Sequence, residues 1–197
     1  MDTKQKILNV ALDLFSKNGY EATSMSMIAE KVGIKKASLY AHYNNKQDIL
    51  DSLILFISKQ YEDNSLFSNT DFKKINIFKS AKDLSNQVKK QVSYIIHNPY
   101  VSKVRKLFTI DQFRNEQLLA LKTKYSYTNV LDFGNKLMEH LIENDVLIKQ
   151  DTLVMASQFV FPISMWIERC DREKEFENEA MKLIEKHVVQ FYKIYQK

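Results

Sequence analysis

The chain has 197 residues, a formal net charge of +5 and an apolar fraction of 45%, which is enough for a sizeable hydrophobic core. Only three glycines and two prolines are present, and this scarcity argues against the turn-rich all-β classes and favours long helices. The mild positive charge is weak support for a nucleic-acid partner, because many proteins are equally basic.

The first 33 residues predict two short helices. Asp2 and Gln5 resemble a capping box that begins the first helix, and Gly19 ends it. Ser24 or Ser26 can cap the second helix, whose apolar side chains are expected to face inward.

A third helix and the start of a fourth follow a tight turn. Gly33 supplies the turn, and the third helix is predicted over about residues 36–43. A helix of this length is not stable alone in water, so the first two helices must hold it in place. Asn45 with Asp48 resembles a cap for the fourth and longer helix.

Beyond residue 71 the pattern changes to long helices. Their boundaries include Asn98-Pro99, since the residue before a proline avoids the helical region, and Asn144-Asp145. Pro162 lies inside one of these helices and should kink it. The predicted long helices span residues 72–97, 100–110, 115–143, 151–169 and 176–195. Together with the N-terminal helices, they predict an all-α protein of about nine helices.

The lysines around the third helix carry the main functional signal. Four lysines and no acidic residue lie between Lys31 and Gln47, and the same stretch contains Tyr40 and His42. A short cationic helix with hydroxyl and imidazole donors, held by a preceding helix, is typical of a helix-turn-helix that binds DNA.

An ordered set of residues extends this signal over the first quarter of the chain. They are Leu14-Phe15, Asn18-Gly19-Tyr20, Ala22-Thr23-Ser24, Ile28-Ala29, Val32-Gly33-Ile34, Ser38-Leu39-Tyr40, His42-Tyr43 and Lys46. In this order and spacing the sequence resembles the TetR family of bacterial transcriptional regulators. The resemblance implies a homodimer with a helix-turn-helix domain (residues 1–50) and an effector-binding and dimerisation domain (residues 51–197). It also implies a pseudo-palindromic double-stranded DNA operator and a small-molecule effector, most simply for a repressor that the effector releases.

The resemblance places eight residues at the DNA. Tyr40, His42 and Lys46 occupy phosphate-contact positions, while the start of the third helix enters the groove. The full set is Ser24, Met25, Lys35, Lys36, Ala37, Tyr40, His42 and Lys46. Ordinary alternatives stay open: Lys36 as a solvated surface lysine, and His42 as a packing histidine.

Two departures from the family pattern leave the operator sequence open. Lys35 stands where the family often has serine, and a lysine cannot cap the third helix. Ala37 stands where many members have glycine, and residues 1–50 contain no arginine to read guanine bidentately. The alternative is a helical small-molecule carrier or interaction protein of the same fold without sequence-specific DNA binding.

Aromatic side chains are plentiful after residue 90. The resemblance implies that some of them line an effector pocket, although aromatics at helical spacing more often belong to a core. The candidate ligand-binding residues are Tyr94, Phe108, Tyr125, Phe161 and Trp166. Because no cluster of acids or histidines accompanies them, we expect a moderately hydrophobic effector rather than a metal or a sugar phosphate.

The last two predicted helices are candidates for a dimer interface. The first is apolar on nearly all sides, and the second has two apolar stripes, of which one can face a partner. The pattern leaves open which stripe does so. The candidate residues are Phe159, Ile163, Ile184, Val188, Phe191 and Tyr195.

Other functional classes find little support in the sequence. Cys170 is the only cysteine, which excludes an internal disulfide and fits a reducing, cytoplasmic compartment. No stretch approaches eighteen apolar residues, so no membrane span is expected. His97, His140 and His187 are isolated, and phosphate-loop and nucleophile motifs are missing from the sequence. We therefore expect no metal, no cofactor and no enzymatic activity.

Overall fold

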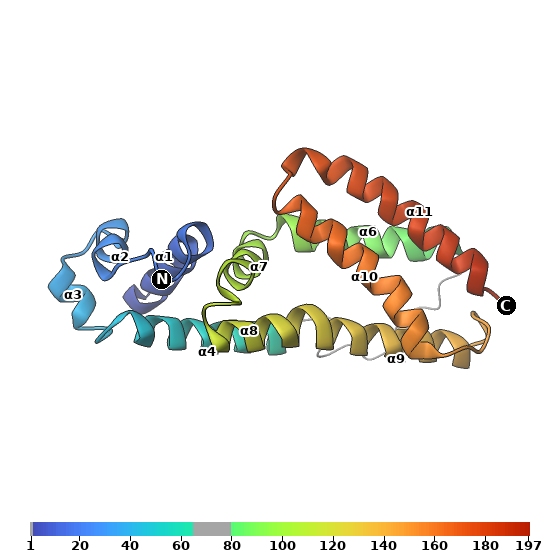
Figure 1. Ribbon diagram of the computed structural model, residues 1–197, viewed down its shortest axis with the longest axis horizontal. Helices are drawn as coiled ribbons and strands as arrows, with labels where there is room; N and C mark the ends of the chain where they lie inside the picture. Colours follow the sequence, from blue (N-terminus) through green and yellow to red (C-terminus); the bar gives the residue numbers. More distant parts are fainter. Residues whose placement is uncertain (1, 65–79) are drawn as a thin grey trace. The chain divides into compact units, whose positions relative to one another are not determined.

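The computed structural model describes residues 2–64 and 80–197, and within these ranges the regular secondary structure is helical (Figure 1). An isolated antiparallel bridge joins Leu147 to Gln196. The helices are α1 (Thr3–Asn18), α2 (Met25–Val32), α3 (Lys36–Tyr40), α4 (Lys46–Asn64), α6 (Ala81–His97), α7 (Pro99–Asp111), α8 (Glu116–Thr123), α9 (Asn129–Glu143), α10 (Thr152–Cys170) and α11 (Glu177–Tyr195). The all-α prediction is confirmed.

The described residues form two compact units. The first contains α1 to α4 together with residues 103–122, which are most of α7 and α8; the second contains α6, α9, α10 and α11. The expected division at residue 50 stays a prediction about function, because the first unit also includes a segment from the middle of the chain.

Local capping explains where the N-terminal helices begin and end. The Ser24 hydroxyl accepts a hydrogen bond from the Met27 N–H at 3.2 Å and begins α2, while Gly33 adopts a left-handed conformation at its end. The expected capping box at Asp2 is wrong, because its side chain makes no capping hydrogen bond. Lys35 likewise provides no side-chain cap for α3, which ends at Tyr40 and is shorter than predicted.

The corner between α3 and α4 is closed by a reciprocal cap. The Asp48 N–H donates to Asn45 Oδ1 at 2.9 Å, and the Asn44 N–H donates to Asp48 Oδ2 at 3.0 Å. This arrangement confirms the predicted cap for the fourth helix and fixes the direction in which α4 leaves the short α3. The hydrophobic core of the first unit contains fully buried side chains from each of the helices α1 to α4, namely Ile7, Phe15, Ile28, Leu39 and Ile49.

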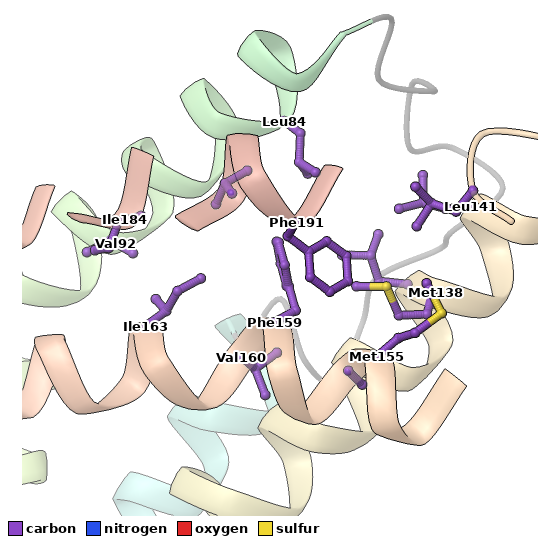
Figure 2. Close-up of a cluster of buried hydrophobic side chains, with 14 of the residues drawn as sticks. Leu84, Val92, Met138, Leu141, Met155, Phe159, Val160, Ile163, Ile184 and Phe191 are labelled. Carbon is purple, nitrogen blue, oxygen red and sulfur yellow. The ribbon is translucent and has the colours of Figure 1, made fainter. Parts of the chain in front are cut away.

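The second unit has its own hydrophobic core. Figure 2 shows Phe159 and Ile163 of α10 directed towards side chains of the neighbouring helices, and Val160 of the same helix belongs to the same core cluster. Helix α9 packs against α10, and α6 packs against α11. A Cβ atom added to Gly134 of α9 would lie only 2.9 Å from Val160 Cγ1, so the small residue permits the close approach of α9 and α10.

The long helix predicted over residues 115–143 is continuous but not uniform. Helices α8 and α9 are joined by a π-helical turn, Lys124–Thr128, which places one wide turn inside the predicted helix. Residues 72–79 of another predicted helix lie outside the described residues, and α6 begins at Ala81. Pro162 lies inside α10, and the Asp151 side chain caps that helix as predicted.

A search for membrane spans among the described helices finds no candidate that is both long and apolar enough to cross a bilayer.

Candidate nucleic-acid interface

Helix α3 exposes several polar side chains that lie close together. Lys35, Lys36 and Ala37 are exposed at the start of α3, and Tyr40 keeps 45% of its surface exposed at its end. The Lys36 ammonium lies 5.9 Å from the centroid of the Tyr40 ring, as expected for residues four positions apart on one helix. An ammonium and a phenolic hydroxyl on one exposed face are suited to phosphate oxygens of a nucleic acid.

The flanking candidates differ in their accessibility. Ser24 is exposed, and His42 is half-buried beyond the end of α3. The Met25 side chain, by contrast, is only 9% exposed and packs inward from the first turn of α2. The structure therefore places Met25 in the core and not among the residues that reach outward.

Lys46 is anchored within the protein. Its ammonium donates to the Tyr20 carbonyl at 2.7 Å and to the Glu21 carbonyl at 3.2 Å, and it lies 4.1 Å from the centroid of the Tyr20 ring. The side chain is only 21% exposed. The ammonium also lies 4.0 Å from the Glu21 carboxylate, so its charge is partly balanced within the protein.

Tyr20 connects three elements of the first unit. Its backbone N–H donates to Asp111 Oδ2 at 2.8 Å, and its hydroxyl donates to Gln47 Oε1 at 2.9 Å. Its ring packs edge-on against Phe15, with 5.4 Å between the ring centroids. Burial, followed by the charges of Glu21 and Asp51, raises the pKa of Tyr20, so the hydroxyl stays protonated and can donate at neutral pH.

A second connection is made by Asp13 of α1. Its carboxylate lies 2.8 Å from the Lys31 ammonium, 3.0 Å from that of Lys103 and 3.1 Å from that of Lys17. The hydrogen bond from Lys31 is the largest cause that holds the pKa of Asp13 well below its ordinary range, and Lys103 and Lys17 add to it against the opposing effect of burial. Lys31 is thus paired with an acid, although the sequence suggested an acid-free stretch of lysines.

Sequence reasoning missed both connections to residues 103–111. Tyr20 and Asp111 are 91 positions apart, and a single aspartate in an amphipathic helix gives no local sign of a distant partner. Asp13 belongs to an ordinary i, i+4 pair with Lys17, which would have been visible in the sequence, but its contacts with Lys31 and Lys103 depend on the packing of α1, α2 and α7.

The candidate ligand-binding residues differ in their burial and belong to different units. Tyr94 is largely exposed, whereas Tyr125 is buried in the π-helical turn. Phe161 and Trp166 are half-buried against the core of the second unit, while Phe108 is fully buried in the first unit. Their assignment to one effector site stays a prediction.

Most of the candidate dimer residues face inward. Figure 2 shows Phe159, Ile163, Ile184 and Phe191 within the hydrophobic core, and Val188 is equally buried. These five side chains have almost no surface left to bury against a partner, so the structure places them in the core of the single chain. Tyr195 is half-buried, and its hydroxyl bonds to Gln158 at 2.5 Å.

Comparisons with known sequences agree with the helix-turn-helix geometry. Residues 7–53 match the family model of bacterial regulatory proteins, tetR family. The biofilm operon icaADBC negative transcriptional regulator IcaR of Staphylococcus epidermidis is 41% identical over 69 residues, a match that covers 31% of this chain and 37% of that protein. IcaR of Staphylococcus aureus is 45% identical over 51 residues, or 26% of this chain and 27% of that protein. The chain thus matches well under half the length of these relatives.

Comparisons with solved structures extend over nearly the whole chain and show the fold. A TetR-family transcriptional regulator of Mesorhizobium loti has a TM-score of 0.73 at 19% identity, with 99% of this chain and 97% of that chain covered. A complex of SmeT with triclosan has a TM-score of 0.68 at 17% identity, with coverage of 99% and 92%. A transcriptional regulator of Saccharomonospora viridis bound to choline has a TM-score of 0.70 at 16% identity, with coverage of 98% and 97%.

Proposed function

We propose that this chain is a DNA-binding transcriptional repressor, because residues 7–53 match the model of the tetR family of bacterial regulatory proteins and the whole chain has the fold of a solved TetR-family regulator. The observation that carries the proposal is the exposed face of α3, where Lys36 and Tyr40 lie side by side on a helix that packs against α2. The relatives from Staphylococcus, which are negative transcriptional regulators, support the direction of the effect.

The proposed contacts divide into two groups. Tyr40, His42 and Lys46 contact phosphates and fix the register of the protein on DNA, while Lys35, Lys36 and Ala37 enter the major groove. The exposed methyl group of Ala37 suits a thymine methyl group, and lysine is the only long cation of this segment that can approach guanine. Ser24 lies at the start of α2, where the free backbone N–H groups of the helix N-terminus can add a phosphate contact.

A selection from randomised double-stranded DNA tests this function and identifies the operator sequence in the same experiment. The protein should enrich a pseudo-palindromic site, with half-sites about one helical turn apart or a multiple of it. A protein that enriches no sequence over several rounds, although it stays folded, would contradict the proposal and favour the carrier or interaction protein.

The symmetry of that site depends on a homodimer. With the inward-facing residues assigned to the core, the surface left for a second copy consists of apolar side chains exposed on the last two helices. They are Leu153, Val154 and Met165 of α10 and Ile194 of α11. A second copy packed on this surface would bury apolar area that is otherwise in contact with water.

Light scattering at about 10 μM should therefore give twice the mass of the chain, a concentration at which a specific interface is expected to hold. Met165→Glu should shift the protein towards monomer. Leu55→Glu is the matched control, because Leu55 and Met165 are both 72% exposed but lie in different units. A wild-type monomer, or equal behaviour of the two variants, would remove this interface.

The effector is proposed to be a moderately hydrophobic small molecule that binds the second unit and lowers the affinity for the operator. The aromatic side chains of this unit support the apolar character, and two proteins of the same fold were solved with triclosan and with choline. A thermal-shift screen followed by operator titration tests the proposal. A saturating effector should weaken operator binding by roughly 5- to 150-fold, and DNA must weaken effector binding by the same factor. Stabilisation by metals or sugar phosphates alone would contradict it.

A further inference from the structure

The end of helix α7 packs against the turn that follows α1, in the same unit as α3. Asp111, the last residue of α7, is only 2% exposed, and its carboxylate accepts the Tyr20 N–H at 2.8 Å. The approach is close: a Cβ atom on Gly19 would lie 3.2 Å from Ile110 Cγ2 and 3.6 Å from Asp111 Oδ1. A buried carboxylate is retained only where it is hydrogen-bonded, so this contact is a defined part of the packing.

Tyr20 is also hydrogen-bonded to the first turn of α4. The Tyr20 carbonyl accepts from the Lys46 ammonium at 2.7 Å, and the Tyr20 hydroxyl donates to Gln47 at 2.9 Å. Lys46 and Gln47 are the first two residues of α4. The reciprocal cap around Asp48 connects this turn to the residues that follow α3.

Two further contacts attach the same segment to the N-terminal helices. The Lys103 ammonium lies 3.0 Å from Asp13 of α1. Gln117 of α8 accepts from Gln47 at 3.1 Å and donates to Asp51 at 3.3 Å, both on α4. These contacts attach the segment over residues 103–122 to α1, to the turn that follows α1 and to α4, and the Asp111 contact with that turn is buried.

We propose that Asp111 is a positioning residue for DNA recognition, which holds the backbone at Tyr20 and thereby sets the first turn of α4 and the end of α3. This inference rests on the proposed DNA-binding function. Asp111 touches no DNA, and neither the helix-turn-helix pattern nor the matched residues 7–53 includes it. Its effect is on the register that Tyr40, His42 and Lys46 set for the base-contacting start of α3, and hence on the preference for the operator over random DNA.

The test compares operator and random DNA of equal length, by fluorescence polarisation at several salt concentrations. Asp111→Ala should weaken operator binding roughly tenfold, the lower end for a lost hydrogen bond to a charged group. Binding to random DNA and the salt slope should stay at the wild-type level, because no phosphate contact is removed. Asp111→Asn, whose amide oxygen can still accept the Tyr20 N–H, should recover operator affinity to within about threefold.

Glu116→Gln is the matched control, since it removes one exposed negative charge from the neighbouring α8 and should bind like the wild type. Each variant is first shown to be folded at the temperature of the titration. If Asp111→Ala does not fold, Asp111→Glu replaces it, because it keeps the charge but displaces the carboxylate by one methylene from the Tyr20 N–H, and it should lower the preference for the operator.

Three results would overturn the inference: wild-type operator affinity in the folded Asp111→Ala protein, equal losses on operator and random DNA, or an Asp111→Asn protein as weak as Asp111→Ala. In the substituted experiment, an unchanged operator preference in a folded Asp111→Glu protein would do the same. A wild-type protein that does not distinguish operator from random DNA would instead contradict the proposed function, and this inference with it.

Discussion

Replacement of Lys46 by alanine should lower both the stability of the fold and the affinity for DNA. The change removes a 2.7 Å hydrogen bond to the Tyr20 carbonyl, a longer one of 3.2 Å to the Glu21 carbonyl and the contact of the ammonium with the Tyr20 ring. A hydrogen bond to a charged group contributes about 1.5–3 kcal/mol, and a partly exposed cation–π contact about 0.5–1 kcal/mol. Because water can replace part of these contacts, we expect a net loss of about 2 kcal/mol, or about 4–8 °C in Tm for a chain of this size.

Thermal unfolding and a DNA titration together separate the two roles of this lysine. Lys59→Ala is the matched control, because Lys59 is an exposed lysine on the same helix and its loss changes the net charge equally. Lys46→Ala should melt well below this control, and its salt slope on DNA should fall by roughly the value of one phosphate, about 0.9. Equal melting temperatures for the two variants would refute the anchoring role. An unchanged salt slope would show that Lys46 supports the fold without contacting a phosphate.

Three further perturbations follow from the same geometry. Asp13→Asn should destabilise the protein by about 1–2 kcal/mol at pH 7. A lowered carboxyl pKa stabilises the fold above the pKa of the unfolded state, and this stabilisation is lost as the pH falls towards the pKa of the folded state. The difference in unfolding free energy between the variant and the wild type, measured by urea titration, should therefore shrink from about pH 4 downwards. A difference that is independent of pH would contradict the pairing with Lys31. Gly19→Ala should cost about 2–3 kcal/mol, since φ 82° and ψ 163° suit only glycine and Ile110 lies close, whereas Gly33→Ala in open space should cost about 1 kcal/mol. Equal losses in chemical denaturation would refute the difference. Tyr40→Phe should weaken operator binding about three- to tenfold with unchanged stability; wild-type binding would remove the phosphate contact.

Local chemistry made much of the fold predictable from the sequence. The caps at Ser24 and Asp48 and the turn at Gly33 depend on residues within a few positions of each other, so their patterns are visible in the sequence. Asp2 shows the limit of the same reasoning, because the residue types of a capping box are present while the side-chain hydrogen bond is not made. The π-helical turn at Lys124–Thr128 changes the helical period by one residue over a single turn, which an apolar stripe does not reveal.

The candidate site was predictable only in part, because its support comes from distant residues. The exposed face around Lys36 and Tyr40 follows from the pattern of α3, and the structure bears out its accessibility. The anchoring of Lys46 requires α4 to begin beside the turn that follows α1, and the contact between Tyr20 and Asp111 requires the end of α7 to reach the same turn. Helical periodicity contains no information about either contact. Periodicity also cannot tell which apolar stripe of α11 faces its own domain. The inward position of Ile184 was therefore not foreseen.

The most direct test of the central claim is a fluorescence-polarisation titration with DNA from upstream of the protein's own gene, against random DNA of the same length and at the same salt concentration. We expect specific binding tighter than random binding by a factor of about 10³ or more, with Lys36→Ala reducing this ratio. Equal affinity of the wild-type protein for this DNA, for its selected site and for random DNA would contradict the account.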